Sequence, residues 1–451
     1  MEVAKNRAAA QHKCANGGGS EATGIQQLPR GEVHLEDVVI VGGGVIGLAC
    51  GLALREAGRT VRVLEASRLG CGSSHGNCGT ITPSHAMPLA APGTVGRALR
   101  WMLAPDAPLY LNPRLDPALW AWLLRFAGRC NRGDWLRGGA AKAAILHASR
   151  LALPEWIGRH GLQCEFIAGG TDHVFRTEQA LVAFDAELRA LADLGIASEH
   201  IDGARYLRQE PALRDGIVGA VRFPGDASLR PDRYVAELAR AFREAGGAVV
   251  EHCEVTGLRE ERDGLRLRTT QGEIPASDVL VATGAWSPRL ASALSPRLRG
   301  VRRAMQPGKG YSITYARPSL APRHPLVLQE RSVCVTTWED GYRLGSTMEF
   351  SGYDASLNPR RLGALERGAR EYLREPLGPS KREEWFGWRP MTFDDLPIIG
   401  RVPGSAPLWL ATGHGMLGVS MSVATAELIA DLVCGRAPRI DPAPFRLERF
   451  G

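Results

Sequence analysis

The first regular pattern in the chain is a pair of short apolar runs that flank an alanine- and leucine-rich segment. The runs cover residues 38–41 and 61–64, and the segment between them extends to Ala57. A short continuous apolar run is typical of a strand buried on both faces, whereas the longer segment has a helical composition. The pattern therefore predicts a βαβ unit, in which two parallel strands are joined by a helix.

The rest of the chain combines helical and alternating patterns. Helical patterns dominate residues 138–200, and a helix followed by a strand is expected within 228–258. Alternating apolar and polar positions within 295–385 predict antiparallel strands separated by turns. The C-terminal segment has the pattern strand, glycine turn, helix, and Gly435 ends that helix. We therefore expect an α/β protein with a Rossmann-type domain and a second domain of mixed sheet and helices.

Three glycines occupy the turn between the first strand and its helix at GxGxxG spacing. Gly42 permits a tight turn, Gly44 lets the backbone approach a pyrophosphate, and Gly47 lets the helix pack closely on the strand. The positive end of the helix then faces the phosphates. Glu65, about 20 residues later, can accept hydrogen bonds from ribose hydroxyls and would repel a 2′-phosphate. The expected nucleotide is therefore FAD or NAD.

Two later segments are expected to lie beside this turn. The small, polar loop 70–79 follows the second strand directly, and its glycines and serines allow a backbone to wrap closely around a ligand. An apolar strand further along ends at Thr283 and Gly284. Because α/β sheets place ligand contacts beyond the carboxyl ends of their strands, this strand returns the chain to the nucleotide domain.

Composition narrows the class of protein. The 451 residues allow two or three domains, and the net charge of +7 comes mainly from arginines that are scattered along the chain. Scattered charge does not form the basic patch that a nucleic acid requires. The nine cysteines occur singly, without a CxxC pair, which indicates reduced thiols in a cytoplasmic setting and no metal site.

Membrane contact is left open by the sequence. Residues 1–35 lack an apolar core and are expected to be a disordered leader, and outside the glycine fingerprint no apolar run has the length of about 18 residues that spanning requires. Between 95 and 130, however, Trp101, Trp120, Trp122 and Phe126 stand beside arginines. These aromatics either fill a core or form a surface that meets a partner subunit or the inner face of the membrane.

Six motifs in this order resemble FAD-dependent amine and amino-acid oxidoreductases of the D-amino-acid oxidase superfamily. They are the fingerprint, SSHGNCG, the strand ending ATGAW, GKGYS, GWRPMTFDDLPIIG and the C-terminal TGHGMLG. The likeness runs from about residue 36 to the end and is greatest for DadA-type D-amino-acid dehydrogenases. The segment CGTITPSHAMPLAAPG also resembles the D-hydroxyproline dehydrogenase branch.

The resemblance implies two interleaved domains. The FAD-binding domain would comprise residues 36–110, 205–290 and 385–451, and the substrate-binding domain residues 111–204 and 291–384. Dissociable, non-covalent FAD is expected. Its contacts would be Gly42, Gly44, Val45, Ile46, Gly47, Glu65, Ala66, Ser73, Ser74, Asn77, Cys78, Gly79, Val255, Thr283, Gly284, Trp286, Gly413, His414, Gly415, Met416, Leu417 and Gly418.

The resemblance also implies oxidation of an amino acid by hydride transfer from Cα to flavin N5. Arg389 would bind the substrate carboxylate, which a planar, permanently charged guanidinium suits. Tyr311 would cover the pocket or hydrogen-bond the carboxylate, and His414 would tune the flavin. Lys309 is expected either to neutralise the reduced flavin or the substrate, or to be a solvated lysine.

Three functional hypotheses follow. The preferred one is a dehydrogenase of D-amino acids or of a cyclic imino acid such as D-hydroxyproline that passes electrons to a quinone or another acceptor. The second is a peroxide-forming oxidase of glycine, sarcosine or D-amino acids. The third is a flavin-holding subunit of a larger electron-transfer complex, against which the presence of Arg389 argues.

Overall fold

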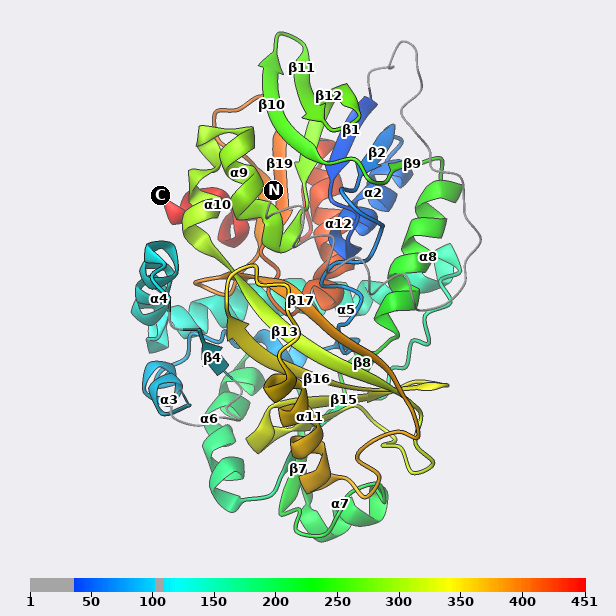
Figure 1. Cartoon of the computed structure of the whole chain (residues 1–451), viewed down its shortest axis with the longest axis vertical. Coiled ribbons are helices and arrows are strands. Elements are labelled where there is room, and N and C mark those ends of the chain that lie inside the picture. The colour runs from blue at the N-terminus through cyan, green and yellow to red at the C-terminus, as the bar shows by residue number, and fades with distance from the viewer. Residues whose placement is uncertain (1–35, 102–108, 113) are drawn as a thin grey trace.

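The computed structural model describes residues 36–101, 109–112 and 114–451, so the predicted leader lies outside the described residues. Two large sheets follow one another along the longest axis of the molecule, one in its upper half and one in its lower half in Figure 1. Helices cover both sheets, and none of the described helices is long and apolar enough to cross a membrane. The mixed α/β architecture predicted from the sequence is confirmed.

The first sheet has a parallel centre in the order β9-β2-β1-β12-β19. Its predicted βαβ unit is present as β1 (Glu36–Val41), α2 (Val45–Glu56) and β2 (Val61–Leu64). Helices α2, α8 and α12 lie beside this sheet (Figure 1). The remaining elements are β9 (Ala248–Val250), β10 (Val255–Glu261), β11 (Gly264–Thr269), β12 (Gly272–Val281), β18 (Ile398–Arg401), β19 (Leu408–Thr412), α8 (Pro231–Glu244) and α12 (Gly418–Val433).

The second sheet is mixed and has the order β17-β13-β16-β15-β14-β5-β7-β6, with β4 paired to β16. Its long antiparallel centre lies between residues 305 and 392, largely within the segment 295–385 in which the alternating pattern was found. Each strand there buries side chains against helices or the other sheet. The strands are β4 (Leu109–Leu111), β5 (Thr171–Phe175), β6 (Glu199–Asp202), β7 (Gly219–Phe223), β13 (Met305–Ala316), β14 (Leu326–Leu328), β15 (Val333–Thr337), β16 (Gly341–Phe350) and β17 (Lys381–Thr392).

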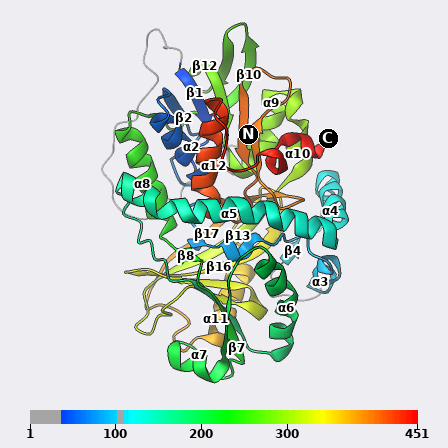
Figure 2. The same cartoon turned by 180° about the vertical axis from the view of Figure 1, so that it is seen from behind.

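Helix α5 (Arg132–His160) crosses the back of the molecule between the two sheets (Figure 2). It begins at Asn131, whose side chain accepts a hydrogen bond from Asp134 N, and ends at Gly161, which has a φ of 58°. The other helices are α3 (Thr94–Trp101), α4 (Pro117–Arg129), α6 (Glu178–Asp193), α7 (Gly203–Gln209), α9 (Ser287–Leu294), α10 (Arg299–Ala304) and α11 (Pro359–Tyr372), and β3 (Thr80–Ile81) pairs with β8 (Ala227–Ser228).

Strand pairing departs from the predicted segment limits in three places, one of which is β4, which crosses the limit at 110 and pairs with β16. Strand β7 lies within residues 205–290 but pairs with β5 and β6, and β17 spans the limit at 385 while pairing with β13. An alternating pattern shows that a strand forms, but it does not show which sheet edge the strand joins. The two-domain division remains a prediction, and these strands belong to the second sheet.

A buried ion pair fixes α5 to the turn after β17. Lys142 Nζ lies 2.7 Å from Asp395 Oδ2, and the two side chains are 3% and 7% exposed. The same carboxylate accepts a hydrogen bond from Leu89 N. Removing one member of a buried pair leaves the other charge uncompensated, which costs far more than losing an exposed pair.

We expect Asp395→Asn to lower the free energy of unfolding by about 3 kcal/mol. Asparagine tolerates the positive φ of 59° at this position, so the loss reports on the charge. The control is Asp215→Asn, which breaks the exposed pair with Arg374 and should cost less than about 1 kcal/mol. Denaturant unfolding of both variants measures the difference, and equal losses would contradict the assignment.

Candidate active site

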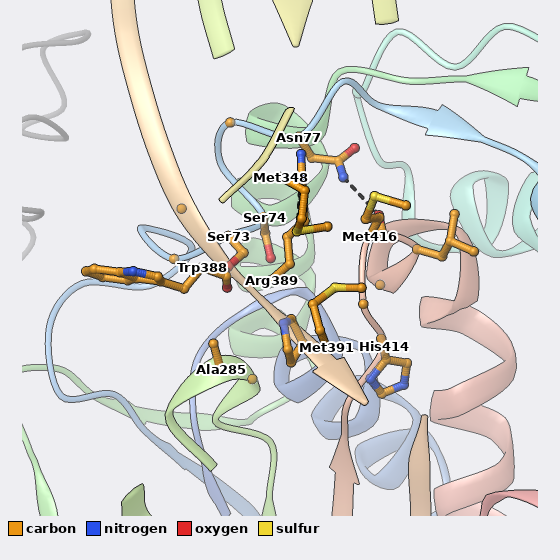
Figure 3. Close-up of a pocket in the computed structure, with 18 of the residues that line it drawn as sticks. Ser73, Ser74, Asn77, Ala285, Met348, Trp388, Arg389, Met391, His414 and Met416 are labelled. Carbon is orange, nitrogen blue, oxygen red and sulfur yellow. Dashed lines mark hydrogen bonds between the residues drawn. The ribbon is translucent and has the colours of Figure 1, made fainter. Parts of the chain in front are cut away.

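The two sheets meet around one large cavity. Its volume is about 1200 Å³, and residues of the βαβ turn, the loop 70–79, the ends of β12 and β19, and strands β13, β15, β16 and β17 line it. Figure 3 shows side chains from the loop, from β17 and from the turn before α12 around the same space. The cavity therefore joins parts of the chain that are more than 300 residues apart in sequence.

The glycine turn has the geometry that its residue types predict. Gly42 has a φ of 112°, and a Cβ there would lie 2.6 Å from Ala282 O. A Cβ on Gly47 would lie 1.9 Å from Gly42 O, so this position holds the helix against the turn. At Gly44 the nearest atom to a Cβ would be Ser74 Oγ at 3.7 Å, and the residue faces the cavity. The turn thus leaves open the space that a pyrophosphate would need.

Two helices begin at the cavity without a side-chain cap. Helix α2 starts after Gly44 and α12 after Leu417, and neither residue provides a capping hydrogen bond. At α2, Val45 N donates to Ser74 Oγ. Because uncapped N–H groups and the positive helix end attract anions, both helix starts suit negatively charged groups of a ligand.

Glu65 stands at the end of β2 and lines the cavity. Its Oε2 accepts a hydrogen bond from Gly43 N at 2.8 Å, and its Oε1 accepts one from Ser67 N at 2.9 Å. These bonds orient the carboxylate beside the glycine turn. A carboxylate has further lone pairs with which it can accept ribose hydroxyls.

The loop 70–79 is tied to both sheets. Ser73 Oγ donates a short hydrogen bond to Trp388 O on β17, and Asn77 Nδ2 donates to Met416 O before α12. From β16, Arg343 Nη1 donates to the carbonyls of His75 and Asn77. The loop is therefore held in place between the nucleotide cradle and the second sheet.

Most of the predicted cofactor contacts line the cavity. They are Gly42, Gly44, Val45, Ile46, Glu65, Ala66, Ser73, Ser74, Asn77, Cys78, Val255, Thr283, Gly284, Trp286, His414, Gly415, Met416, Leu417 and Gly418. Gly47, Gly79 and Gly413 do not line the cavity and lie behind the residues that do. A Cβ on Gly79 would approach Leu229 O to 2.0 Å, and Gly413 has a φ of 78°, so both shape turns. Direct contact of each residue with FAD remains a prediction.

Arg389 presents a guanidinium to the cavity without a carboxylate partner. Its Nη1 donates to Thr347 O at 2.6 Å, and its Nη2 donates to Ser346 O at 3.4 Å. None of the described acidic side chains forms an ion pair with it. Burial lowers the pKa of this guanidinium, but arginine stays protonated in proteins. The site therefore holds a cation that lacks an anion.

Tyr311 lines the cavity, and Lys309 does not. Tyr311 Oη donates to Glu349 Oε2 at 3.1 Å, and burial together with Glu349 raises the pKa of the phenol. Lys309 is fully buried, and its Nζ donates to Asp354 Oδ2 and Ser356 O. A register shift in the pairing with β16 falls between the two residues. The structure therefore does not bring Lys309 to the site.

His414 lines the cavity as a neutral ring. Its Nε2 lies 3.1 Å from Thr425 Oγ1, and burial lowers the pKa of the imidazole to about 3. The ring carries no charge near neutral pH. Any effect on a flavin would therefore come from its position and its backbone, since the turn from Gly413 to Gly415 leads into α12.

Sequence reasoning missed several lining groups. A Cβ on Gly310 would lie 2.3 Å from Arg389 Cζ, so Gly310 makes room for the guanidinium. The GKG motif, which contains Gly310, was the feature of the sequence that could have indicated this close approach. Ser346 and Thr347 supply carbonyls from β16, and Trp388 has an indole N–H without a partner among the described residues. Strand register brings these groups to the site, and the local sequence does not reveal it.

The residues fit FAD. The open cradle at Gly44, the two helix starts at the cavity and the carboxylate of Glu65 suit a dinucleotide. A dinucleotide cradle beside a second sheet that supplies a buried cation defines a class, namely nucleotide-dependent oxidoreductases. The chain matches the DAO family of FAD-dependent oxidoreductases over residues 37–432 and belongs to that family.

Similar sequences and similar solved structures are consistent with membership of this family. The chain is 33% identical over 421 residues to a D-amino acid dehydrogenase of Xanthobacter autotrophicus, covering 92% of this chain and 99% of the relative. It is 34% identical over 424 residues to one of Rhizobium rhizogenes, covering 92% and 100%. The fold is similar to that of glycine oxidase from Geobacillus kaustophilus (TM-score 0.74, 24% identity, 92% and 98% covered) and of L-proline dehydrogenase from P. horikoshii (TM-score 0.70, 17% identity, 92% and 98% covered).

We expect Gly47→Ala to weaken FAD binding by about tenfold or more, because the added Cβ displaces the Gly42 carbonyl and opens the turn. The control is Gly128→Ala in α4, where a Cβ meets no atom within 4 Å. Titration of the two apoproteins with FAD, followed by flavin fluorescence, gives both dissociation constants. A Gly47→Ala protein that binds FAD as tightly as the control would refute the role of this turn.

Proposed function

We propose that this enzyme is a dehydrogenase of D-amino acids or of a cyclic imino acid such as D-hydroxyproline, and that it passes the electrons to a quinone or another acceptor. The observation that carries the proposal is the buried Arg389 guanidinium, which has no carboxylate partner in the part of the chain that the structure describes and which lines the cavity together with the nucleotide cradle. The names of the relatives from Xanthobacter autotrophicus and Rhizobium rhizogenes support the amino-acid substrate.

Each part of the site would have a distinct role in the oxidation of the substrate. The glycine turn and Glu65 would hold FAD, which would supply the hydride acceptor for Cα of a neutral amine; the iminium that results would lose a proton to give an imine, which water would hydrolyse. Arg389 binds the carboxylate in two hydrogen bonds and thereby fixes the position of Cα. Tyr311, held by Glu349, forms part of the wall of the pocket. The start of α12 directs positive N–H groups at the cavity, where they stabilise negative charge.

An anaerobic spectrum of the holoenzyme with a panel of D-amino acids, L-amino acids and both hydroxyproline epimers tests the proposal. We expect a D-amino or imino acid to bleach the flavin absorbance, a quinone to restore it quickly, and air to restore it slowly. Fast recovery in air with stoichiometric peroxide would instead establish an oxidase. Absence of bleaching by every compound would leave a flavin-holding subunit.

We also propose that the enzyme is cytoplasmic and contacts the inner face of the membrane at its periphery. The support is a surface on α3 and α4 on which Leu99 is 60%, Trp120 51% and Leu124 75% exposed, beside the exposed Arg97 and Arg100. Apolar side chains flanked by arginines suit an anionic headgroup layer. The holoenzyme should sediment with vesicles that contain anionic lipid and remain in solution with neutral ones, and no sedimentation with either would refute the contact.

A further inference from the structure

The cavity extends beyond the space that the cradle and Arg389 use. On β16 it passes Met348 and Phe350, which pair with Leu109 and Leu111 of β4, and it reaches the side of the molecule where α3, α4 and α6 lie (Figures 1 and 2). We call this part the outer compartment. Its apolar lining consists of Val95, Leu99, Trp101, Trp120, Leu124 and Phe184.

The mouth of the outer compartment is apolar and open to the outside. None of the residues of α3 is buried, although the helix carries Val95, Leu99 and Trp101. Leu124 on α4 is 75% exposed and lines the cavity as well. Exposed apolar side chains that continue into a cavity favour a ligand that is itself apolar.

Polar side chains also line the cavity in this part, among them the imidazoles of His85 and His173 and the charged side chains of Arg97 and Glu187. His173 is 6% exposed, its Nδ1 lies 3.2 Å from Gln329 Oε1, and its Nε2 has no partner among the described residues. The His85 ring lies 5.6 Å away, and burial lowers the pKa of His173 to about 3 and that of His85 to about 4. In the neutral His173 ring Nδ1 donates to Gln329 Oε1, which leaves Nε2 as an acceptor only.

We infer that the outer compartment binds the electron acceptor, a lipid-soluble quinone. The inference rests on the proposed function. A quinone has an apolar ring and tail that match the mouth, and two oxygens that can accept hydrogen bonds from polar lining groups such as the Gln329 amide. A zwitterionic amino acid gains nothing from the apolar mouth, since its charges need partners.

The redox balance closes without another reactant. The amino acid loses two electrons and two protons when it becomes the imine. The quinone gains two electrons and two protons when it becomes the quinol. Arg389 and the outer compartment line one cavity, so a bound substrate and a bound acceptor would share the space beside the nucleotide cradle.

The experiment measures binding of a short-chain benzoquinone to the holoenzyme by equilibrium dialysis, with no amino acid and no lipid present. We expect saturable binding to the wild type, and a dissociation constant raised about fivefold or more in Leu99→Gln and in Leu124→Gln, because each removes an apolar contact. The matched control is Leu151→Gln in α5, a residue that is 65% exposed and does not line the cavity, and it should bind quinone as the wild type does.

Steady-state kinetics with the same variants separate the two ligands. The KM for quinone should rise while the KM for the amino acid, measured with a soluble dye as acceptor, changes much less. A rise in the amino-acid KM with unchanged quinone affinity would assign the compartment to the substrate side chain and overturn the inference. Absence of quinone binding to the wild type would overturn it too. Quinone binding without flavin bleaching by any amino acid would instead contradict the proposed function.

Discussion

The arrangement of the site depends on a buried cation that has no acidic partner among the described residues. The Arg389 guanidinium is held by two carbonyls of β16 and by the space that Gly310 leaves, and none of the described acids approaches it. Carbonyl oxygens compensate only part of the cost of burying a charge, so a ligand carboxylate gains the remainder when it binds. The guanidinium is thus prepared for an anion before one arrives, which lowers the cost of ordering the complex.

The two sheets give this cation its place relative to the nucleotide. Strands β13 and β17 run antiparallel and bring Arg389 to the cavity, and the carbonyl of the adjacent Trp388 accepts a hydrogen bond from Ser73 of the loop 70–79. The same loop is bonded to Met416 before α12. Cradle, loop, cation and second helix start therefore form one connected unit, and a change in any of them is expected to move the others.

The sequence predicted best the parts of the site that are contiguous in the chain. The turn from Gly42 to Gly47 and the acid at 65 follow from local residue types, because glycine conformations and helix starts are local properties. Register and sheet membership are not local. Three features of the site depend on distant strands, so alternation alone could not reveal them. They are the register shift between Lys309 and Tyr311, the strands with which β7 pairs, and the carbonyls that hold Arg389.

The most direct test of the central role of Arg389 is a titration of the holoenzyme with a small carboxylate and with the matching neutral amide, followed by the visible flavin spectrum. If the guanidinium binds a ligand carboxylate, the acid perturbs the flavin spectrum saturably and the amide does not. Arg389→Met then abolishes the response to the acid, while the protein still holds FAD. Equal binding of acid and amide, or an Arg389→Met variant that binds the acid as the wild type does, would contradict the account.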